Sequence, residues 1–363
     1  MSTTEYKPGI SIEDLPPELR QREPLKLASN ENPLGPSPLA LQAIRDSLET
    51  LNIYPSKQLE WQLRQAIAAS ISDQLGPEHI VIGSGGIEVL EFVARSHLPT
   101  PDDASALPRQ SFPFLARFSG RSGNPINFFD LDEADFRYQP ERIAAAITPN
   151  TRLVYVCNPN NPSGTYSTAA ELQQIMAVVP DDVLLIHDEA YLDFVDAPDF
   201  PNLLPEVLAG KNLFLMRTFA KIYGLAGLRL GFGIAPPAVI ERVAGVKRNF
   251  HINKLSLVAA LAALNDADHR QRTIANNAAG KQWLTEQLTR LDCHVWPSQA
   301  NFVLFSHQSV PAQMLIDGLM AQAIIVRPAF GLDNHIRLSI GTPEQNARLI
   351  ESLTAVLNKE IGD

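Results

Sequence analysis

A lysine and an arginine in a turn of small residues are the side chains of this sequence with the clearest chemical potential. Lys221 lies in a stretch rich in alanine and glycine, and Arg229 follows eight positions later. A lysine amine in such a turn can hold an aldehyde as a Schiff base, and a planar guanidinium suits a phosphate dianion. Thr218 offers a hydroxyl to the same phosphate. The segment 217–231 therefore predicts a site for a phosphorylated aldehyde.

Two further polar motifs follow apolar runs that are typical of buried strands. Asn161 lies in the sequence Asn-Pro-Asn-Asn-Pro-Ser-Gly after the apolar run 153–156, and Asp188 and Tyr191 follow the run 183–186. Ligands of parallel sheets bind beyond the carboxyl ends of the strands, so we expect these side chains to meet Lys221. The asparagine and proline motif could otherwise be a simple turn, because these residues dominate turns.

A glycine-rich loop follows another short apolar run, at 80–82. Gly85, Gly86 and Ile87 stand where a strand should pass into a helix, and backbone N–H groups at a helix start bind anions. We expect a second phosphate contact here. The rival interpretation is a non-catalytic nucleotide-binding module, but the loop lacks the spacing G-x-G-x-x-G and leaves Lys221 and Asp188 unexplained.

Composition and charge exclude several other classes of function. A formal net charge of −10 and a pI near 5.3 disfavour nucleic acid as a partner. The longest apolar stretch, 255–264, is too short to cross a membrane, and the N-terminus lacks a secretory signal, so we expect a cytoplasmic protein. We predict no metal site, because His187 and its acidic neighbours on one strand would point to opposite faces.

The order of apolar and polar segments predicts an α/β fold with two domains. Helical patterns alternate with short apolar strands from about residue 37, which indicates a mostly parallel sheet with helices on both faces. We expect an N-terminal arm (1–36) that joins the small domain, a large domain (37–268) and a small C-terminal α+β domain (269–363). The proline-rich start of the chain is typical of an extended arm.

Together these motifs resemble the pyridoxal-phosphate (PLP) site of the aspartate-aminotransferase superfamily. The segment 27–38, with the sequence Leu-Ala-Ser-Asn-Glu-Asn-Pro-Leu-Gly-Pro-Ser-Pro, and the form of the lysine segment are most similar to histidinol-phosphate aminotransferases. The match runs in order from about residue 6 to 342. It implies the PLP-transferase fold of type I, with a seven-stranded sheet, and PLP as the cofactor.

The resemblance also assigns roles to the cofactor site. Lys221 is the Schiff-base lysine and moves the proton, Asp188 holds the pyridine nitrogen protonated, and Tyr191 and Asn161 donate to the phenolic oxygen. Phe112 stacks on the ring. The phosphate contacts are Arg229, Thr218 and the loop of Gly85, Gly86 and Ile87.

The same resemblance implies where the substrates bind. Arg337 receives the carboxylate of glutamate and the phosphate end of histidinol phosphate, and Arg327, Tyr6 and Asn30 are further substrate contacts. Tyr54 reaches the PLP phosphate of the other subunit, which implies a homodimer with a shared active site.

The expected activity is transfer of an amino group from histidinol phosphate to 2-oxoglutarate, which gives imidazole acetol phosphate and glutamate in a ping-pong cycle. The alternatives are transamination of an aromatic or other amino acid, or a related reaction such as phospho-amino-acid decarboxylation. Four departures from the family pattern leave room for them: Ile10, Gly86, Ile87 and Ala220. Three of these departures, Gly86, Ile87 and Ala220, leave two side-chain donors missing from the phosphate site, so we expect weaker retention of PLP.

Overall fold

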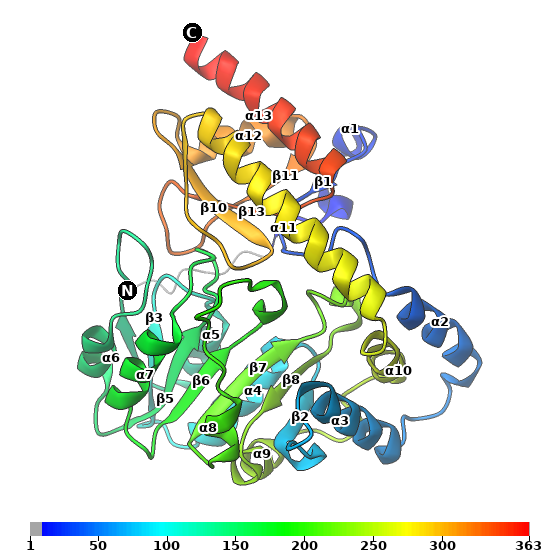
Figure 1. The fold of residues 1–363 in the computed structure, drawn as a ribbon, viewed down its shortest axis with the longest axis vertical. Coiled ribbons are helices and arrows are strands. Elements are labelled where there is room, and N and C mark those ends of the chain that lie inside the picture. Colours follow the sequence, from blue (N-terminus) through cyan, green and yellow to red (C-terminus); the bar gives the residue numbers. More distant parts are fainter. Residues whose placement is uncertain (1–8, 363) are drawn as a thin grey trace.

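A seven-stranded sheet forms the centre of the large domain in the computed structural model, which describes residues 9–362 (Figure 1). The strands lie in the order β2 (Ile80–Gly83), β8 (Gly231–Ile234), β7 (Leu213–Thr218), β6 (Leu184–Asp188), β5 (Thr151–Cys157), β3 (Ala104–Pro108) and β4 (Ile126–Phe129). Only β8 runs antiparallel to its neighbours. The carboxyl ends of β5, β6 and β7 therefore meet at one edge of the sheet.

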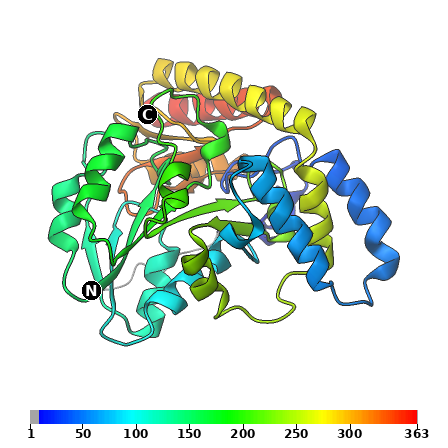
Figure 2. The same cartoon turned by 60° about the horizontal axis from the view of Figure 1, so that its bottom comes forward.

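Helices cover both faces of this sheet (Figures 1 and 2). One face packs against α2 (Pro38–Ser47), α3 (Lys57–Ile71), α6 (Pro140–Ala146), α7 (Ala169–Val178), α8 (Leu204–Leu208) and α10 (Lys254–Ala263). The other face packs against α4 (Gly86–His97), α5 (Phe114–Ser122) and α9 (Pro237–Ala244). Successive strand residues alternate between the two cores, as the pleat of a strand requires. The sheet is buried on both sides, so its strands consist of nearly continuous apolar runs.

Several helices of the large domain begin at caps that the sequence provides. Ser37 accepts a hydrogen bond from the Ala40 N–H at the start of α2, where Pro38 occupies the first position. Thr168 and Glu171 form the reciprocal capping box expected at the start of α7. Each cap satisfies N–H groups that the helix itself leaves without a partner.

A smaller domain lies at the carboxyl edge of the large sheet (Figure 1). Its four-stranded antiparallel sheet has the order β12 (Arg327–Pro328), β13 (Ile336–Ser339), β10 (Phe302–His307) and β9 (Cys293–Val295). The helices of this domain are α12 (Ala312–Ala321) and α13 (Pro343–Gly362). The 24-residue helix α11 (Ala267–Arg290) runs from the large domain into the small one, so the expected boundary at 268 lies within its first turn.

The N-terminal segment pairs with the small domain. Strand β1 (Leu25–Lys26) lies parallel to β11 (Ile324–Ile325), and the chain then crosses the carboxyl edge of the large sheet at residues 28–31. The remaining short elements are α1 (Pro17–Arg20), η1 (Ile12–Asp14), η2 (Leu48–Thr50), η3 (Pro77–His79), η4 (Leu192–Phe194) and η5 (Ala226–Leu228). Between residues 9 and 362, no helix is long and apolar enough to span a bilayer.

Candidate active site

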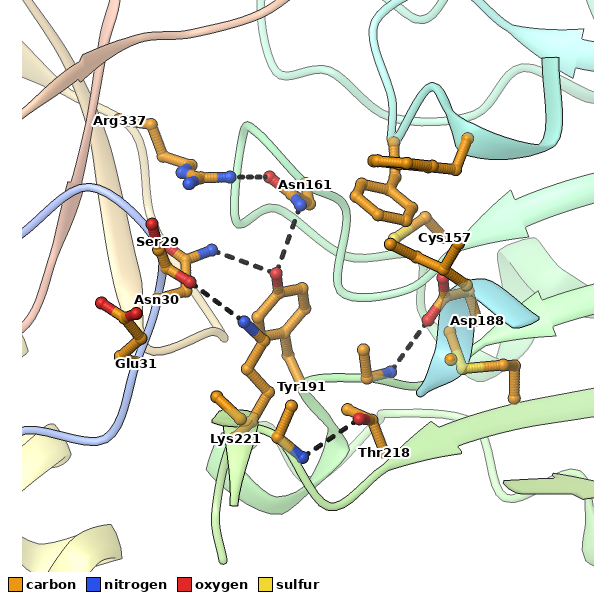
Figure 3. Close-up of a pocket in the computed structure, with 18 of the residues that line it drawn as sticks. Ser29, Asn30, Glu31, Cys157, Asn161, Asp188, Tyr191, Thr218, Lys221 and Arg337 are labelled. Atoms are coloured by element: carbon orange, nitrogen blue, oxygen red, sulfur yellow. Dashed lines mark hydrogen bonds between the residues drawn. The ribbon is translucent and has the colours of Figure 1, made fainter. Parts of the chain in front are cut away.

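A cavity of about 390 Å³ lies where the arm, the large sheet and the small domain meet. Its walls include the ends of β6 and β7, the loop after β5 and the start of α4. Figure 3 shows that the predicted residues Lys221, Asp188, Tyr191, Asn161 and Arg337 face this space together. The parallel order of β5, β6 and β7 explains the convergence, because the residues that follow the three strand ends share one edge.

Lys221 extends its amine towards the N-terminal arm. Its Nζ donates a hydrogen bond to the backbone oxygen of Ser29 at 3.1 Å and lies 5.7 Å from the centre of the Tyr191 ring. Removal from bulk water and the nearby charge of Arg337 lower the pKa of the Lys221 amine to about 7. At neutral pH a large fraction of this amine is therefore unprotonated and able to act as a nucleophile.

Tyr191 is held by two asparagines. Its hydroxyl oxygen accepts the Nδ2 groups of Asn30 at 3.0 Å and of Asn161 at 3.2 Å (Figure 3). Burial raises the pKa of Tyr191 far above neutral, so the phenol keeps its proton. With both accepted bonds coming from protein, the hydroxyl proton remains for donation into the cavity.

Asp188 lies at the opposite end of the cavity, at the last position of β6, and is 2% exposed. Its Oδ1 accepts the N–H of Ala190 at 3.0 Å, and its Oδ2 accepts the hydroxyl of Tyr155 at 2.7 Å. Burial raises the pKa of Asp188 to about 6, although both hydrogen bonds oppose the shift. A buried carboxylate of this kind fits a protonated ring nitrogen, whose charge would compensate its own.

Two arginines of the small domain line the same cavity. Arg327 and Arg337 are directly opposite each other on β12 and β13, and the ring of Phe330 lies 5.7 Å from both guanidinium carbons. Arg337 is 4% exposed and donates to Asn161 Oδ1 at 2.7 Å and to the Ala28 oxygen at 2.6 Å. This pair of cations can receive a doubly charged anion, or a carboxylate and a phosphate.

The start of α4 forms a cradle with room for a phosphate. Its N-cap residue, Gly85, has a φ of 84° and no side chain that could cap the first N–H groups. The guanidinium of Arg229 lies against Gly85, and a Cβ atom at Gly231 would overlap the backbone of Gly86. The backbone N–H groups of a helix start beside an arginine suit a dianion. The residues present therefore fit the phosphate group of PLP.

One predicted phosphate contact, Thr218, has its hydroxyl engaged within the protein. The hydroxyl of Thr218 faces the cavity but donates to the Leu230 oxygen at 3.3 Å and accepts the Ala220 N–H at 3.1 Å. Ala220 and Gly86 line the cavity without any side-chain donor. In this structure, Arg229 and backbone N–H groups are the donors at this end of the site.

The other predicted residues lie in different surroundings. Phe112, Ile87 and Asn30 all line the cavity, and Asn30, which is 1% exposed, uses its side chain on Tyr191 and Ser339. Tyr54 is 76% exposed and does not line the cavity of its own chain. Tyr6 lies outside the described residues.

Sequence patterns did not indicate several residues of the cavity wall. Ser29 contributes its backbone oxygen, which every residue type has, so the sequence gives no signal for this contact. Phe330 lies in an irregular loop, where no periodic pattern is expected. Phe114 could have been noticed, because it is a second phenylalanine two positions after Phe112. The two rings lie 4.9 Å apart in the structure. Tyr155 does not line the cavity but bonds Asp188, which does, and it was not indicated because a tyrosine in an apolar strand is normally a core residue.

Comparisons with known proteins agree with this geometry. The family model for class I and II aminotransferases matches residues 22–353. Histidinol-phosphate aminotransferase of Moorella thermoacetica is 39% identical, over 98% of this chain and 92% of the relative, and histidinol-phosphate aminotransferase 1 of Nitrosococcus oceani is 38% identical, over 98% and 95%. The chain belongs to the histidinol-phosphate aminotransferase family. The resemblance predicted from the motifs is thereby confirmed.

A solved structure of this aminotransferase family identifies the cofactor. Histidinol-phosphate aminotransferase from Sinorhizobium meliloti in complex with pyridoxal-5'-phosphate superimposes with a TM-score of 0.84 and 25% identity, over 99% of this chain and 100% of that chain. The expected type I fold and the PLP cofactor are confirmed. The protein is a PLP-dependent aminotransferase, and such enzymes move an amino group from an amino donor to a 2-oxo acid.

Proposed function

We propose that this aminotransferase transfers the amino group of histidinol phosphate to 2-oxoglutarate. The supporting observation is the pair Arg327 and Arg337, which face each other across two strands beside the amine of Lys221. A phosphorylated amino donor needs a cationic pocket within reach of the reactive amine, and 2-oxoglutarate needs a guanidinium for a carboxylate. The relatives at 36–39% identity that carry the name histidinol-phosphate aminotransferase support this choice of substrate.

The proposed roles of the cofactor residues follow from their contacts. PLP supplies an aldehyde and an electron-accepting ring when it is bound. Lys221 would hold the aldehyde and, once released, take and return a proton at Nζ, for which a pKa near 7 is well suited. Asp188 would hold the ring nitrogen, and Tyr191 and Asn161 the phenolic oxygen. Arg229, Thr218 and the loop of Gly85, Gly86 and Ile87 would hold the phosphate, with Phe112 against the ring.

The surface around Tyr54 supports a homodimer in which each subunit completes the site of its partner. The rings of Tyr54 and Phe250 lie 4.9 Å apart, and the two side chains are 76% and 60% exposed. Leu48, Leu51 and Ile53 are exposed on the same segment. An apolar patch of this kind on a protein surface marks an interaction site. We propose that a second copy of the chain covers it, in the cytoplasm.

A panel of amino donors tests the substrate. With 2-oxoglutarate as acceptor, kcat/KM should be highest for histidinol phosphate and far lower for histidinol, phenylalanine and tyrosine. Lys221→Ala should abolish turnover with every donor and remove the visible absorption band that borohydride reduces in the wild type. Equal rates with histidinol phosphate and phenylalanine would overturn the substrate proposal, and an active Lys221→Ala variant would overturn the role of the lysine.

One observation favours a second candidate, an aromatic amino-acid aminotransferase. Phe112, Phe114 and Phe330 line the cavity and could enclose a phenyl ring as well as an imidazole. The two candidates differ at Arg327, because phenylalanine has no second anion for this guanidinium to receive. The same donor panel separates them.

A further inference from the structure

The hydrogen bond between Tyr155 and Asp188 has no place in the roles described above. The Tyr155 hydroxyl donates to Asp188 Oδ2 at 2.7 Å, and the two residues are 1% and 2% exposed. The other carboxylate oxygen accepts the N–H of Ala190 at 3.0 Å. Each oxygen of the carboxylate thus has one fixed donor, so its orientation is determined by protein groups alone.

The pairing of two parallel strands explains how the tyrosine reaches the carboxylate. On β5 and β6, Cys157 is opposite Asp188, and Tyr155 is opposite Ile186. Residues two apart on a strand share a face, so Tyr155 is a diagonal neighbour of Asp188, within reach of an aromatic side chain. Its ring belongs to the core cluster between the sheet and α4, which includes Phe214. The hydroxyl is therefore held in place by packing.

Other titratable groups near Asp188 do not replace this bond. They are His187 on β6, Glu189 directly after it, Cys157 on β5, Tyr138 in the large domain, and Lys221 and Tyr191 at the cavity. His187 and Glu189 bond each other at 3.1 Å, and Glu189 also bonds Arg217. Among residues 9–362, Tyr155 is the one whose side chain bonds Asp188.

We propose that Tyr155 is a positioning residue that keeps the Asp188 carboxylate ionised and fixed in orientation for the ring nitrogen of PLP. The inference rests on the proposed role of Asp188. A hydrogen bond donated to a carboxylate favours its charged form, which burial disfavours. Tyr155 remains a donor, because burial and the neighbouring Asp188 raise the pKa of its phenol far above neutral.

Replacement of the tyrosine by phenylalanine tests the proposal, and the chain offers a matched control. Tyr138 is also buried, but its hydroxyl accepts the Cys157 N–H at 2.8 Å and has no bond to Asp188. Tyr155→Phe and Tyr138→Phe each remove one buried hydroxyl beside β5. Only the first removes a donor from the carboxylate.

The first measurement is the affinity of the apoprotein for PLP, with binding monitored by absorbance. Tyr155→Phe should weaken PLP binding about tenfold or more, since hydrogen bonds to charged groups are the stronger ones. It should also move the acidic limb of the kcat/KM profile to higher pH. In an Asp188→Ala background the same change should alter PLP affinity less than about twofold, because the partner is gone.

The second measurement is the thermal stability of the apoproteins at pH 5 and pH 8, which needs no cofactor. Burial raises the pKa of Asp188 to about 6, so its ionisation costs stability as the pH rises through that value. Without the Tyr155 hydroxyl this cost should grow. The gap in Tm between wild type and Tyr155→Phe should therefore be wider at pH 8, whereas the gap for Tyr138→Phe should not change.

Two results would overturn the inference. One is a Tyr155→Phe protein with wild-type PLP affinity and pH profile, and the other is a loss of stability that is independent of pH and matches that of Tyr138→Phe. A wild-type protein that does not take up PLP would overturn the proposed function instead. The apoprotein comparison would then still decide whether Tyr155 supports the charge of Asp188.

Discussion

A carboxyl group whose pKa is raised on folding stabilises the folded protein while it is protonated, and this contribution is lost as the group ionises. The pKa of Asp188 is raised from its ordinary value to about 6 by burial. In the apoprotein its contribution to stability is complete below about pH 4 and is lost as the pH rises through 6. Binding of a protonated ring nitrogen would supply a balancing cation.

Asp188→Asn should therefore have opposite effects on the apoprotein and on catalysis. The amide cannot ionise, so the variant apoprotein should become more stable than wild type as the pH rises from 4 to 8, by up to about 2–3 kcal/mol. Turnover should fall by orders of magnitude, because an amide cannot keep a pyridine nitrogen protonated. Urea unfolding at several pH values and steady-state kinetics measure the two effects. A variant that kept most of its activity would make Asp188 structural.

The two arginines of the small domain should divide the anionic groups of the substrates. Arg337→Ala should lower kcat/KM for both glutamate and histidinol phosphate about 10- to 100-fold, because a charge-assisted contact is lost in a site that both substrates use in turn. Arg327→Ala should affect histidinol phosphate more than glutamate. Equal losses for both substrates in both variants would contradict this division.

Close approach of backbones at the start of α4 makes one glycine a sensitive position. A Cβ atom at Gly231 on β8 would overlap the backbone of Gly86, and backbone cannot rotate away as a side chain does. Gly231→Ala should displace the start of α4, destabilise the protein by about 1–3 kcal/mol and weaken PLP binding. Gly120→Ala on α5 is the control, since a Cβ there meets only Ile126 at 3.9 Å and Gly120 does not line the cavity. Thermal unfolding and PLP titration test this, and equal behaviour of the two variants would refute it.

Elements with strong local patterns could be predicted from the sequence, and elements without them could not. The runs at β5, β6 and β7 are continuous and apolar, and polar motifs follow each of them, so the site at their ends was predictable. Strand β3 has the sequence Ala-Ser-Ala-Leu-Pro, and β4 is only partly buried. Neither shows a β-branched run, and both owe their place to pairing with neighbouring strands.

Contacts between distant segments were the least accessible to sequence reasoning. Asn30, an expected substrate contact, lines the cavity and uses its amide on Tyr191 and Ser339. These contacts form because the arm pairs with β11, and no local sequence pattern predicts the register of that pairing. The helix α11 begins at Ala267, and its early turns are mainly polar and alanine-rich, so they show little of the apolar periodicity that predicts a helix.

At the scale of the whole molecule, the proposed homodimer would divide the predicted site between two chains, with Tyr54 on the partner's side. Fourteen of the fifteen predicted site residues are described, and Tyr54, which is 76% exposed, is the one of these that neither lines nor borders the cavity. Its neighbour Phe250 is likewise exposed and stacks against it. If a second copy covers this patch, each active site would take Lys221 from one subunit and Tyr54 from the other.

Mixed dimers would then recover activity from two defective parents. The Lys221→Ala and Tyr54→Ala proteins should each have little activity. When the two are unfolded together and refolded, some dimers contain one subunit of each kind. In such a hybrid, one of the two sites has an intact Lys221 and an intact Tyr54 from the partner. With equal amounts, half of the dimers are hybrids, so about a quarter of all sites should be wild type. The control is a mixture of the Lys221→Ala and Asp188→Asn proteins. Lys221 and Asp188 of one site come from the same subunit, so every site of a hybrid keeps one defect. No recovery is expected. Kinetics of the refolded mixtures measure this. Recovery in neither mixture would place Tyr54 outside the partner's site.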